Sequence, residues 1–465
     1  MECETIALTF FLACIMSNSL DQVPAEIISS IVSHLDDTSL CVTARTALSL
    51  QPHAERLLYL KVDLTDTVAP SAQNMRDRTK TFLRTITENF RGLGCHTISL
   101  GAHYFGDYKL HEYLPQGLEG PTTPRYTNPY AYAFIRMPNL TAIKLLWIDT
   151  SLSNVLVPYD DPSRTKLNHF CVNFRDISEE DMRKTSGYLF QYLKDQPHLH
   201  CLSLFFPNDV WVSPPGIAGP ILPEYSVDTV AAGLCHSLEV LEGNDMVVRL
   251  LFPGRRVKKL LWRCHFTTGE IEDFRPPASL NAYPTFCNPY FTPEMCEAYG
   301  RLEHLAIFDR LSLFPLLSPF LTSLTSLLIH EYPERIGRQP IWDDSRFLEA
   351  LGNIAKLETL VVTPGADVSE FWEWPDDREP EEEQIFNVCH SLKSLVFLKF
   401  GHFEVWAGGM VYLPFAYERE GGVGGNIVMS RKRQALDKVL DIPYLLRGWS
   451  TFDVDSEVLK YLRPQ

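Results

Sequence analysis

Apolar residues between positions 24 and 35 recur at the spacing of one helical face. The positions are Ile27, Ile28, Ile31, Val32 and Leu35. Pro24 stands where a first helical turn tolerates proline, and Glu26 follows in the turn that favours a negative charge. Asp36 and Asp37 then interrupt the pattern. The spacing therefore predicts a helix over residues 24–35.

Two further short helices are expected after this break. Thr38 can cap a helix that starts at Ser39, and Pro52 opens another whose apolar positions include Leu57 and Leu58. Residues 61–64 then resemble the start of a strand. Three short helices within about fifty residues bury too little apolar surface to be stable alone. We therefore expect them to pack against a partner or the rest of the chain.

From residue 71 onward, helical patterns alternate with short strand patterns of the form Leu-x-x-Leu-x-(Leu/Ile/Val). Helices are expected in 71–90, 178–193, 227–234, from 292, in 347–354 and in 385–389. Strand patterns occur at 95–100, 140–145, 167–172, 199–204, 237–241, 302–307, 324–329, 357–362 and 392–397, with a looser copy at 257–262. Alternation places two apolar side chains on one strand face, while the first leucine closes the preceding turn.

Each of these units leaves an apolar face that only a neighbouring unit can cover, which favours stacking. The series resembles a leucine-rich-repeat solenoid with unequal repeats of roughly 20–40 residues. The Asn or Cys that links repeat turns in that family is mostly missing here, so the resemblance implies an irregular horseshoe. An ordinary α/β domain with alternating helices and strands is the alternative.

The first helical segment resembles a fungal-type F-box, through the pattern (Leu/Val)-Pro-x-Glu-(Ile/Leu)-(Ile/Leu)-x-x-Ile-(Val/Leu/Phe)-x-x-Leu. Residues 43–48 depart from the Cys-Arg-x-Trp-like stretch usual in that family. The resemblance implies docking of a Skp-type adaptor, and through it a cullin. The residues that it assigns to the docking patch are Leu20, Val23, Pro24, Ile27, Ile28, Ile31, Leu35 and Leu40. The expected fold class is therefore α/β, a small three-helix F-box followed by an irregular leucine-rich-repeat solenoid.

Composition narrows the choice of partners. The net charge is 42 − 58 = −16, which disfavours a general binder of nucleic-acid phosphates. The basic run at 431–433 is interpreted as a solvated helix face. Eleven cysteines without a CxxC motif suggest reduced thiols in the cytoplasm or nucleus. No segment is apolar for long enough to span a membrane, so no membrane partner is expected.

Residues 6–16 are apolar, but Glu2 and Glu4 precede them where a secretory signal carries positive charge. We expect translation to start at Met16 or the leader to be an unstructured extension. The predicted division is a leader (1–16), an F-box (17–64), a linking helix (65–92), the solenoid (93–447) and a C-terminal tail (448–465).

The sequence contains no G-x-S-x-G nucleophile elbow, no H-E-x-x-H zinc-protease motif, no set of protein-kinase motifs and no dinucleotide-binding fingerprint. The glycine-rich residues 421–425 lack the Lys-Ser/Thr of a phosphate-binding loop. We therefore expect no catalysis, cofactor or metal, and the F-box resemblance implies a non-catalytic substrate adaptor of a Skp/cullin/F-box ubiquitin ligase. Its repeats, or the insertions at 103–132, 206–225, 274–291 and 376–383, would bind a protein substrate. The alternatives are a repeat scaffold without a ligase role and a secreted leucine-rich recognition protein.

Overall fold

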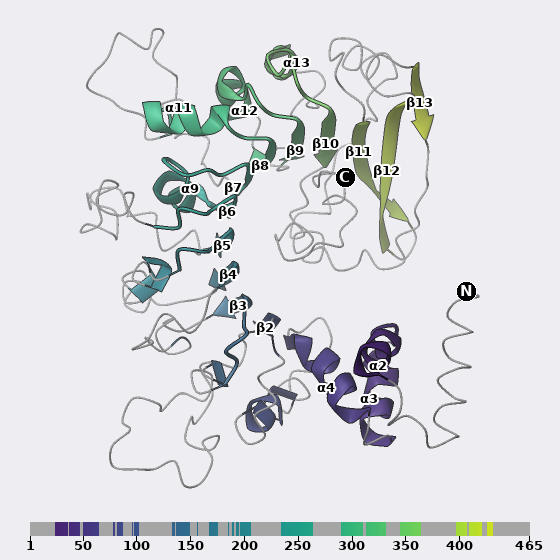
Figure 1. Ribbon diagram of the computed structural model, residues 1–465. Coiled ribbons are helices and arrows are strands. Elements are labelled where there is room, and N and C mark those ends of the chain that lie inside the picture. Colours follow the sequence, from purple (N-terminus) through teal and green to yellow (C-terminus); the bar gives the residue numbers. More distant parts are fainter. Residues whose placement is uncertain are drawn as a thin grey trace. The chain divides into compact units, whose positions relative to one another are not determined.

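The computed structural model divides into two compact units, 1–196 and 197–465, which are described separately (Figure 1). The described residues are 24–35, 37–46, 50–64, 78–79, 81–86, 95, 97–101, 133–134, 136–148, 156, 167–174, 185, 188–189, 192–194, 196–205, 234–263, 290–309, 313–331, 345–363, 397–406, 409–420 and 426–430.

The first unit begins with three short helices where the hydrophobic spacing predicts them. They are α2 (Ala25–Val32), α3 (Asp37–Thr46) and α4 (Gln51–Leu60). Their shared core consists of the buried residues Ile28, Val32, Leu40, Leu50 and Ala54. The core is small, as expected for so short a segment.

The same unit continues with four parallel strands, paired in the order in which they occur along the chain. They are β1 (Lys61–Leu64), β2 (Thr97–Gly101), β3 (Ala142–Ile148) and β4 (His169–Phe174). The register between β3 and β4 shifts once, between Leu145 and Ile148. Residues 81–86 and 133–134, between these strands, and residues 188–189 and 192–194, after β4, are helical.

The second unit repeats this arrangement with seven parallel strands, each paired with the next one along the chain. They are β5 (Cys201–Phe205), β6 (Val240–Asn244), β7 (Lys259–Arg263), β8 (His304–Asp309), β9 (Ser326–Glu331), β10 (Thr359–Thr363) and β11 (Phe397–Trp406). Sequential parallel neighbours are the arrangement of stacked repeats. The unit is therefore an α/β stack, as the strand motif predicts.

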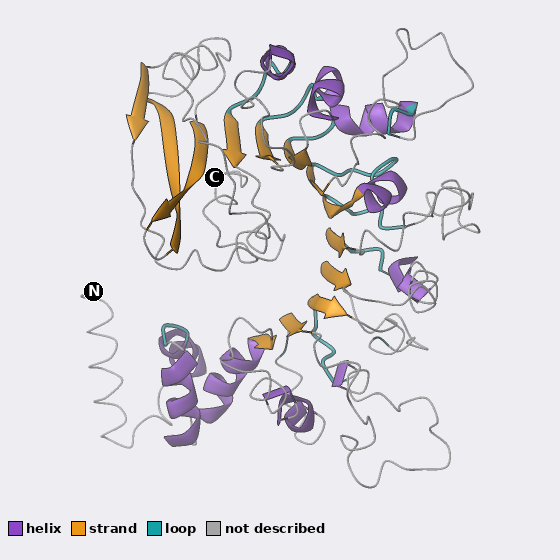
Figure 2. Cartoon of the chain, turned by 180° about the vertical axis from the view of Figure 1, so that it is seen from behind, coloured by secondary structure: helices purple, strands orange, loops and turns teal. Residues whose placement is uncertain are grey.

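Helices cover one side of this sheet (Figure 2). They are α9 (Asp245–Leu251), α11 (Pro293–Gly300), α12 (Leu313–Leu317), the 3-10 turn η7 (Ser318–Phe320) and α13 (Ser345–Gly352). Side chains cap two of them: Asn244 accepts a hydrogen bond from the N–H of Val247, and Thr292 accepts one from the N–H of Met295. The sequence predicts α11 and α13, whereas α9 and α12 were not predicted.

The strand register stacks the central leucines of successive repeats in one row. Its fully buried members are Leu202, Leu241, Leu260, Leu305, Leu327 and Leu360. The row two positions later faces the helices, because Trp262 donates a hydrogen bond to Asp245 of α9 and its ring stacks on Tyr299 of α11. These two rows form the core of the second unit.

The end of the sheet departs from the prediction. Residues 392–396 of the strand expected at 392–397 lie outside the described residues. Strand β11 begins at Phe397, and Leu398 rather than Leu395 pairs with Leu360. The motif fits one set of residues centred on Leu395 and another centred on Leu398, and pairing with β10 selects the second set. Two antiparallel strands, β12 (Gly409–Glu420) and β13 (Asn426–Ser430), then follow within the range assigned to repeats. Within the described residues, β11 is the last of the parallel strands.

Gly243 lies in β6 on the helix-covered face, and its missing side chain permits the close approach of α9. A Cβ there would lie 2.5 Å from Cγ1 of Val247 and 3.1 Å from the carbonyl oxygen of Leu204. Gly243→Ala should lower the free energy of unfolding by about 2 kcal/mol through overpacking. Gly352→Ala, with no atom within 4 Å of the added Cβ, is the control and should leave it unchanged or slightly raised. Urea unfolding of both variants measures the difference.

Candidate functional site

The start of α2 presents part of the predicted docking patch to solvent. Pro24 is exposed, and its carbonyl accepts hydrogen bonds from the N–H groups of Ile27 and Ile28 at 3.0 and 3.1 Å. Ile27 is 47% exposed, which is unusual for so large an apolar side chain in a small helical bundle. Pro24 and Ile27 are thus positions of the patch that a partner could contact directly.

The other predicted docking residues lie deeper or outside the described chain. Ile28 and Leu40 belong to the helical core, and Ile31 and Leu35 pack against it while remaining partly accessible. Leu20 and Val23 lie outside the described residues. The structure therefore separates a surface part of the predicted patch from a part that holds the helices together.

Val42 of α3 is 55% exposed, and the sequence analysis did not select it. Helix geometry places Leu40, Thr43 and Ala44 on one side of α3, and all three are buried or packed against the core. Val42 lies about 200° around the helix from Leu40 and so points away from the core. The sequence contains a signal for this exposure, because Val42 is an apolar residue two positions after a core leucine, on an otherwise polar helix face.

A side-chain contact fixes α2 to α4, and α4 leads without a linker into the sheet. The hydroxyl of Ser29 and Nδ1 of His53 lie 2.9 Å apart. Helix α4 ends at Leu60, β1 begins at Lys61, and the two elements are in contact. The three helices are thus joined directly to the first strand of the repeats.

At five turns between repeats, one backbone carbonyl accepts two successive N–H groups of the next repeat. The carbonyl of His200 accepts from Glu239 and Val240 at 2.9 and 3.0 Å, and that of Lys258 accepts from Glu303 and His304 at 2.9 and 3.0 Å. The carbonyls of Glu239 and Glu303 repeat the arrangement in the second unit, and that of Thr141 repeats it in the first. These paired bonds set the strand register.

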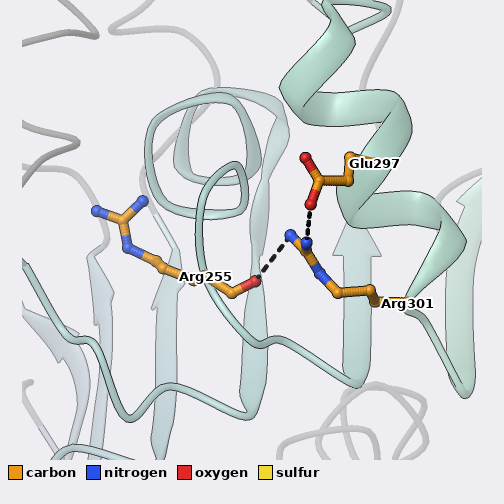
Figure 3. Close-up of polar contacts among 3 residues, drawn as sticks. All are labelled: Arg255, Glu297 and Arg301. Atoms are coloured by element: carbon orange, nitrogen blue, oxygen red, sulfur yellow. Dashed lines mark hydrogen bonds and ion pairs between the residues drawn. The ribbon is translucent and has the colours of Figure 1, made fainter.

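Side chains reinforce the same turns (Figure 3). The buried guanidinium of Arg255 donates to the carbonyls of Leu234 and Pro253, at 3.1 and 2.8 Å. The carbonyl of Arg255 in turn accepts a hydrogen bond from Arg301 at 3.2 Å, and Arg301 is paired with Glu297 at 2.5 Å. Arginine side chains thus link successive turns in this stretch. In leucine-rich-repeat proteins, which the sequence resembles, an Asn or Cys makes such links.

Burial makes the thiol of Cys235 chemically inert. It raises the pKa of Cys235 to about 11, although the nearby charge of Arg255 opposes the shift. Cys235 also adopts a left-handed backbone conformation, with φ 51°, where glycine is usual. A neutral, buried thiol in a strained turn is a structural residue, not a nucleophile.

The strand face opposite the helices is also buried. Its central row comprises Ser203, Glu242, Leu261, Ala306 and Leu328, none more than 5% exposed. The polar members of this row, Ser203 and Glu242, are fully buried, so their side chains are not part of the surface.

His304 lies on this same face, between Lys259 and Ser326 in the strand register. It is 9% exposed, and its Nδ1 has no hydrogen-bond partner among the described residues. Burial lowers the pKa of His304 to about 4; Lys259 and Lys258 act in the same direction, and Glu303 opposes them. The imidazole is therefore neutral in the folded protein at pH 7.

The described residues hold no group of three or more His, Cys, Asp or Glu that could bind a metal ion. Within that same part of the chain, no helix has the length and apolar character needed to cross a membrane. The insertions at 103–132, 206–225 and 376–383 lie outside the described residues, as does most of 274–291.

Comparisons with known proteins add little to this geometry. No protein family matches the sequence, and no curated protein does. Among solved structures, the chain is similar to internalin C2 from Listeria monocytogenes str. 4b F2365, with 12% identity and a TM-score of 0.20, over 51% of this chain and 69% of that one. At that TM-score the similarity carries no argument, so the description of the fold rests on the strands themselves.

The neutral, buried state of His304 predicts a pH-dependent stability. The unfolded chain takes up this proton near the ordinary pKa of 6.5, whereas the folded chain does so only near pH 4. The contribution of His304 to stability should be complete above pH 6.5 and decline as the pH falls toward 4, by at most about 3 kcal/mol. His304→Asn should flatten this part of the profile in urea unfolding.

His236, an exposed histidine in the turn before β6, provides the matched control. His236→Asn should leave the wild-type pH profile unchanged. A wild-type profile in His304→Asn would contradict the assignment of this acid sensitivity to His304.

Proposed function

We propose that this chain is a protein-interaction scaffold whose stacked repeats hold a protein partner. The observation that supports this most strongly is the series of sequential parallel strands, with the same paired hydrogen bonds at five of the turns that precede them. Such stacks offer long rims of turns and helices, the surfaces that repeat proteins use for binding. Burial of both sheet faces supports binding at these rims.

We further propose that the scaffold serves as the substrate-recognition adaptor of a Skp/cullin/F-box ubiquitin ligase. The F-box resemblance of residues 17–64 motivates this role. Three short helices, a small core and exposed apolar residues on α2 and α3 are compatible with docking to a partner. Contacts would centre on Pro24 and Ile27, with Val42 as an additional candidate.

The proposed mechanism is proximity, without chemistry in this chain. An adaptor held by the helices and a substrate held by the repeats would be brought together, raising the effective concentration of substrate lysines near a charged ubiquitin carrier. The direct junction of α4 with β1 favours such positioning, because a flexible linker would dilute the effect.

A cytoplasmic or nuclear location is part of this proposal. The described cysteines Cys41, Cys95, Cys171, Cys201, Cys235 and Cys296 are all free thiols. Free thiols are the usual state of cysteine in a reducing compartment.

Ile27→Glu should abolish most binding to a purified Skp-type adaptor while leaving the fold intact, because the side chain is half-exposed on α2. We expect at least a roughly tenfold loss of affinity, as for a central apolar contact replaced by a charge. Isothermal titration calorimetry of the full chain measures the affinity, and thermal unfolding verifies the fold. Val42→Glu tests whether α3 shares the surface.

Leu60→Glu is the matched control, since Leu60 is 39% exposed at the end of α4 and outside the proposed patch. It should bind as the wild type does. An absence of adaptor binding by the folded wild-type chain would exclude the ligase role and leave the repeat scaffold.

A further inference from the structure

The turns before the strands of the second unit share one pattern of burial. A fully buried leucine or valine stands near the end of each turn, for example Leu238 before β6, Val257 before β7 and Leu302 before β8. The residue directly before the buried one is exposed or half-buried in every turn. We call these surface residues the turn row: His198, Ser237, Arg256, Arg301, Ser323 and Lys356.

The turn row concentrates positive charge in an acidic chain. None of its members is acidic, although the whole chain carries a net charge of −16. Neighbouring strands are about 4.8 Å apart, so the arginines of the turns before β7 and β8, Arg256 and Arg301, are adjacent. The guanidinium of Arg301 donates to the carbonyl of Arg255 at 3.2 Å, directly beside Arg256 (Figure 3). Like charges at such neighbouring positions destabilise a fold, and a bound anion offsets that cost.

One cation of this cluster has no acidic partner. Arg301 pairs with Glu297, and the side chain of Lys258 pairs with Glu303 at 3.0 Å. Arg256, in contrast, is exposed, and its side chain makes no hydrogen bond or ion pair with the described residues. The guanidinium of Arg256 is therefore accessible to a carboxylate from another molecule.

A buried histidine beside this cluster responds to the same positive charge. Burial is the main cause that lowers the pKa of His304 to about 4, and Lys259 and Lys258 lower it further. Glu303 opposes the lysines but does not balance them. The turns before β7 and β8 thus lie in a positive local field, which attracts anions.

We propose that the turn row from Arg256 to Lys356 binds an acidic segment of a protein partner, with Arg256 as the main contact. The two cations are three strand spacings apart, about 14 Å, and the carboxylates of residues i and i+4 of an extended segment are separated by nearly the same distance. Guanidinium and carboxylate form strong, charge-assisted hydrogen bonds. The inference rests on the proposed scaffold function, because it names the charge of the protein that the repeats hold.

The probe is a fluorescein-labelled peptide of alternating glutamate and serine, titrated with the full chain and followed by fluorescence anisotropy. We expect saturable binding that weakens as salt is added, because the contacts are exposed ion pairs. The same peptide with lysine in place of glutamate is the control and should not bind. Absence of binding by the acidic peptide, or equal binding by both peptides, overturns the proposal.

Arg256→Glu locates the site, because an exposed side chain without partners can be replaced while the fold is retained. We expect the affinity for the acidic peptide to fall at least roughly tenfold, since an attraction becomes a repulsion. Lys356→Glu should lower it roughly threefold. Arg56→Glu, at an exposed position of α4, is the matched control: it changes the net charge equally and should bind as the wild type does. Thermal unfolding verifies each fold, and wild-type affinity in Arg256→Glu would contradict the assignment.

A nucleic-acid partner gives a distinct result. A labelled thymidine oligonucleotide that binds more tightly than the acidic peptide, and that Arg256→Glu no longer binds, would identify a nucleic-acid site and overturn the proposal. Binding of the lysine peptide alone would overturn the acidic partner while leaving the scaffold function in place. A folded chain that binds neither peptide nor the adaptor would remove the support for both proposals.

Discussion

The stacking of the repeats depends on one backbone constraint, seen at five turns: a single carbonyl before the strand accepts two successive N–H groups from the following repeat. The carbonyl of Glu239 does so with Lys258 and Lys259, and that of Glu303 with Thr325 and Ser326. A strand whose first residues are held in this way cannot slip by one position, which would reverse the faces of its side chains. The row of buried leucines from Leu202 to Leu360 follows from that register.

Because the constraint lies at the start of the strand, the rest of each repeat can vary. Helix α9 follows β6 at once, and α11 is preceded by a much longer segment. The added links are equally local: Arg255 and Arg301 serve the turns before β7 and β8, and Thr325 donates its hydroxyl to the carbonyl of Glu303 before β9. Unequal repeats stack in one sheet because only the turn has to match.

These contacts also show how far the sequence could predict the structure. The leucine motif located most strands within a few residues, since its period is a property of a single segment. At β11 two overlapping sets of residues fit the motif, one centred on Leu395 and one on Leu398, and only pairing with β10 decides between them. It also missed α9, whose short apolar stretch gives a weak periodic signal. Burial of Ser203 and Glu242 was not predictable, because it depends on how distant parts of the chain pack.

The predicted docking residues also show the difference between what one segment of sequence predicts and what depends on packing. A helical period marks Ile27, Ile28 and Ile31 together as apolar, but it does not say which of them the neighbouring helices cover. Packing against α4 buries Ile28 and leaves Ile27 half-exposed. Where the central rows of a sheet and the core of a bundle are filled, the positions left for recognition lie at the periphery: apolar side chains that the core does not use, and the turns between repeats. Selection of partners at such places requires few residues, which is why a repeat protein can keep its leucine rows while its binding surface changes.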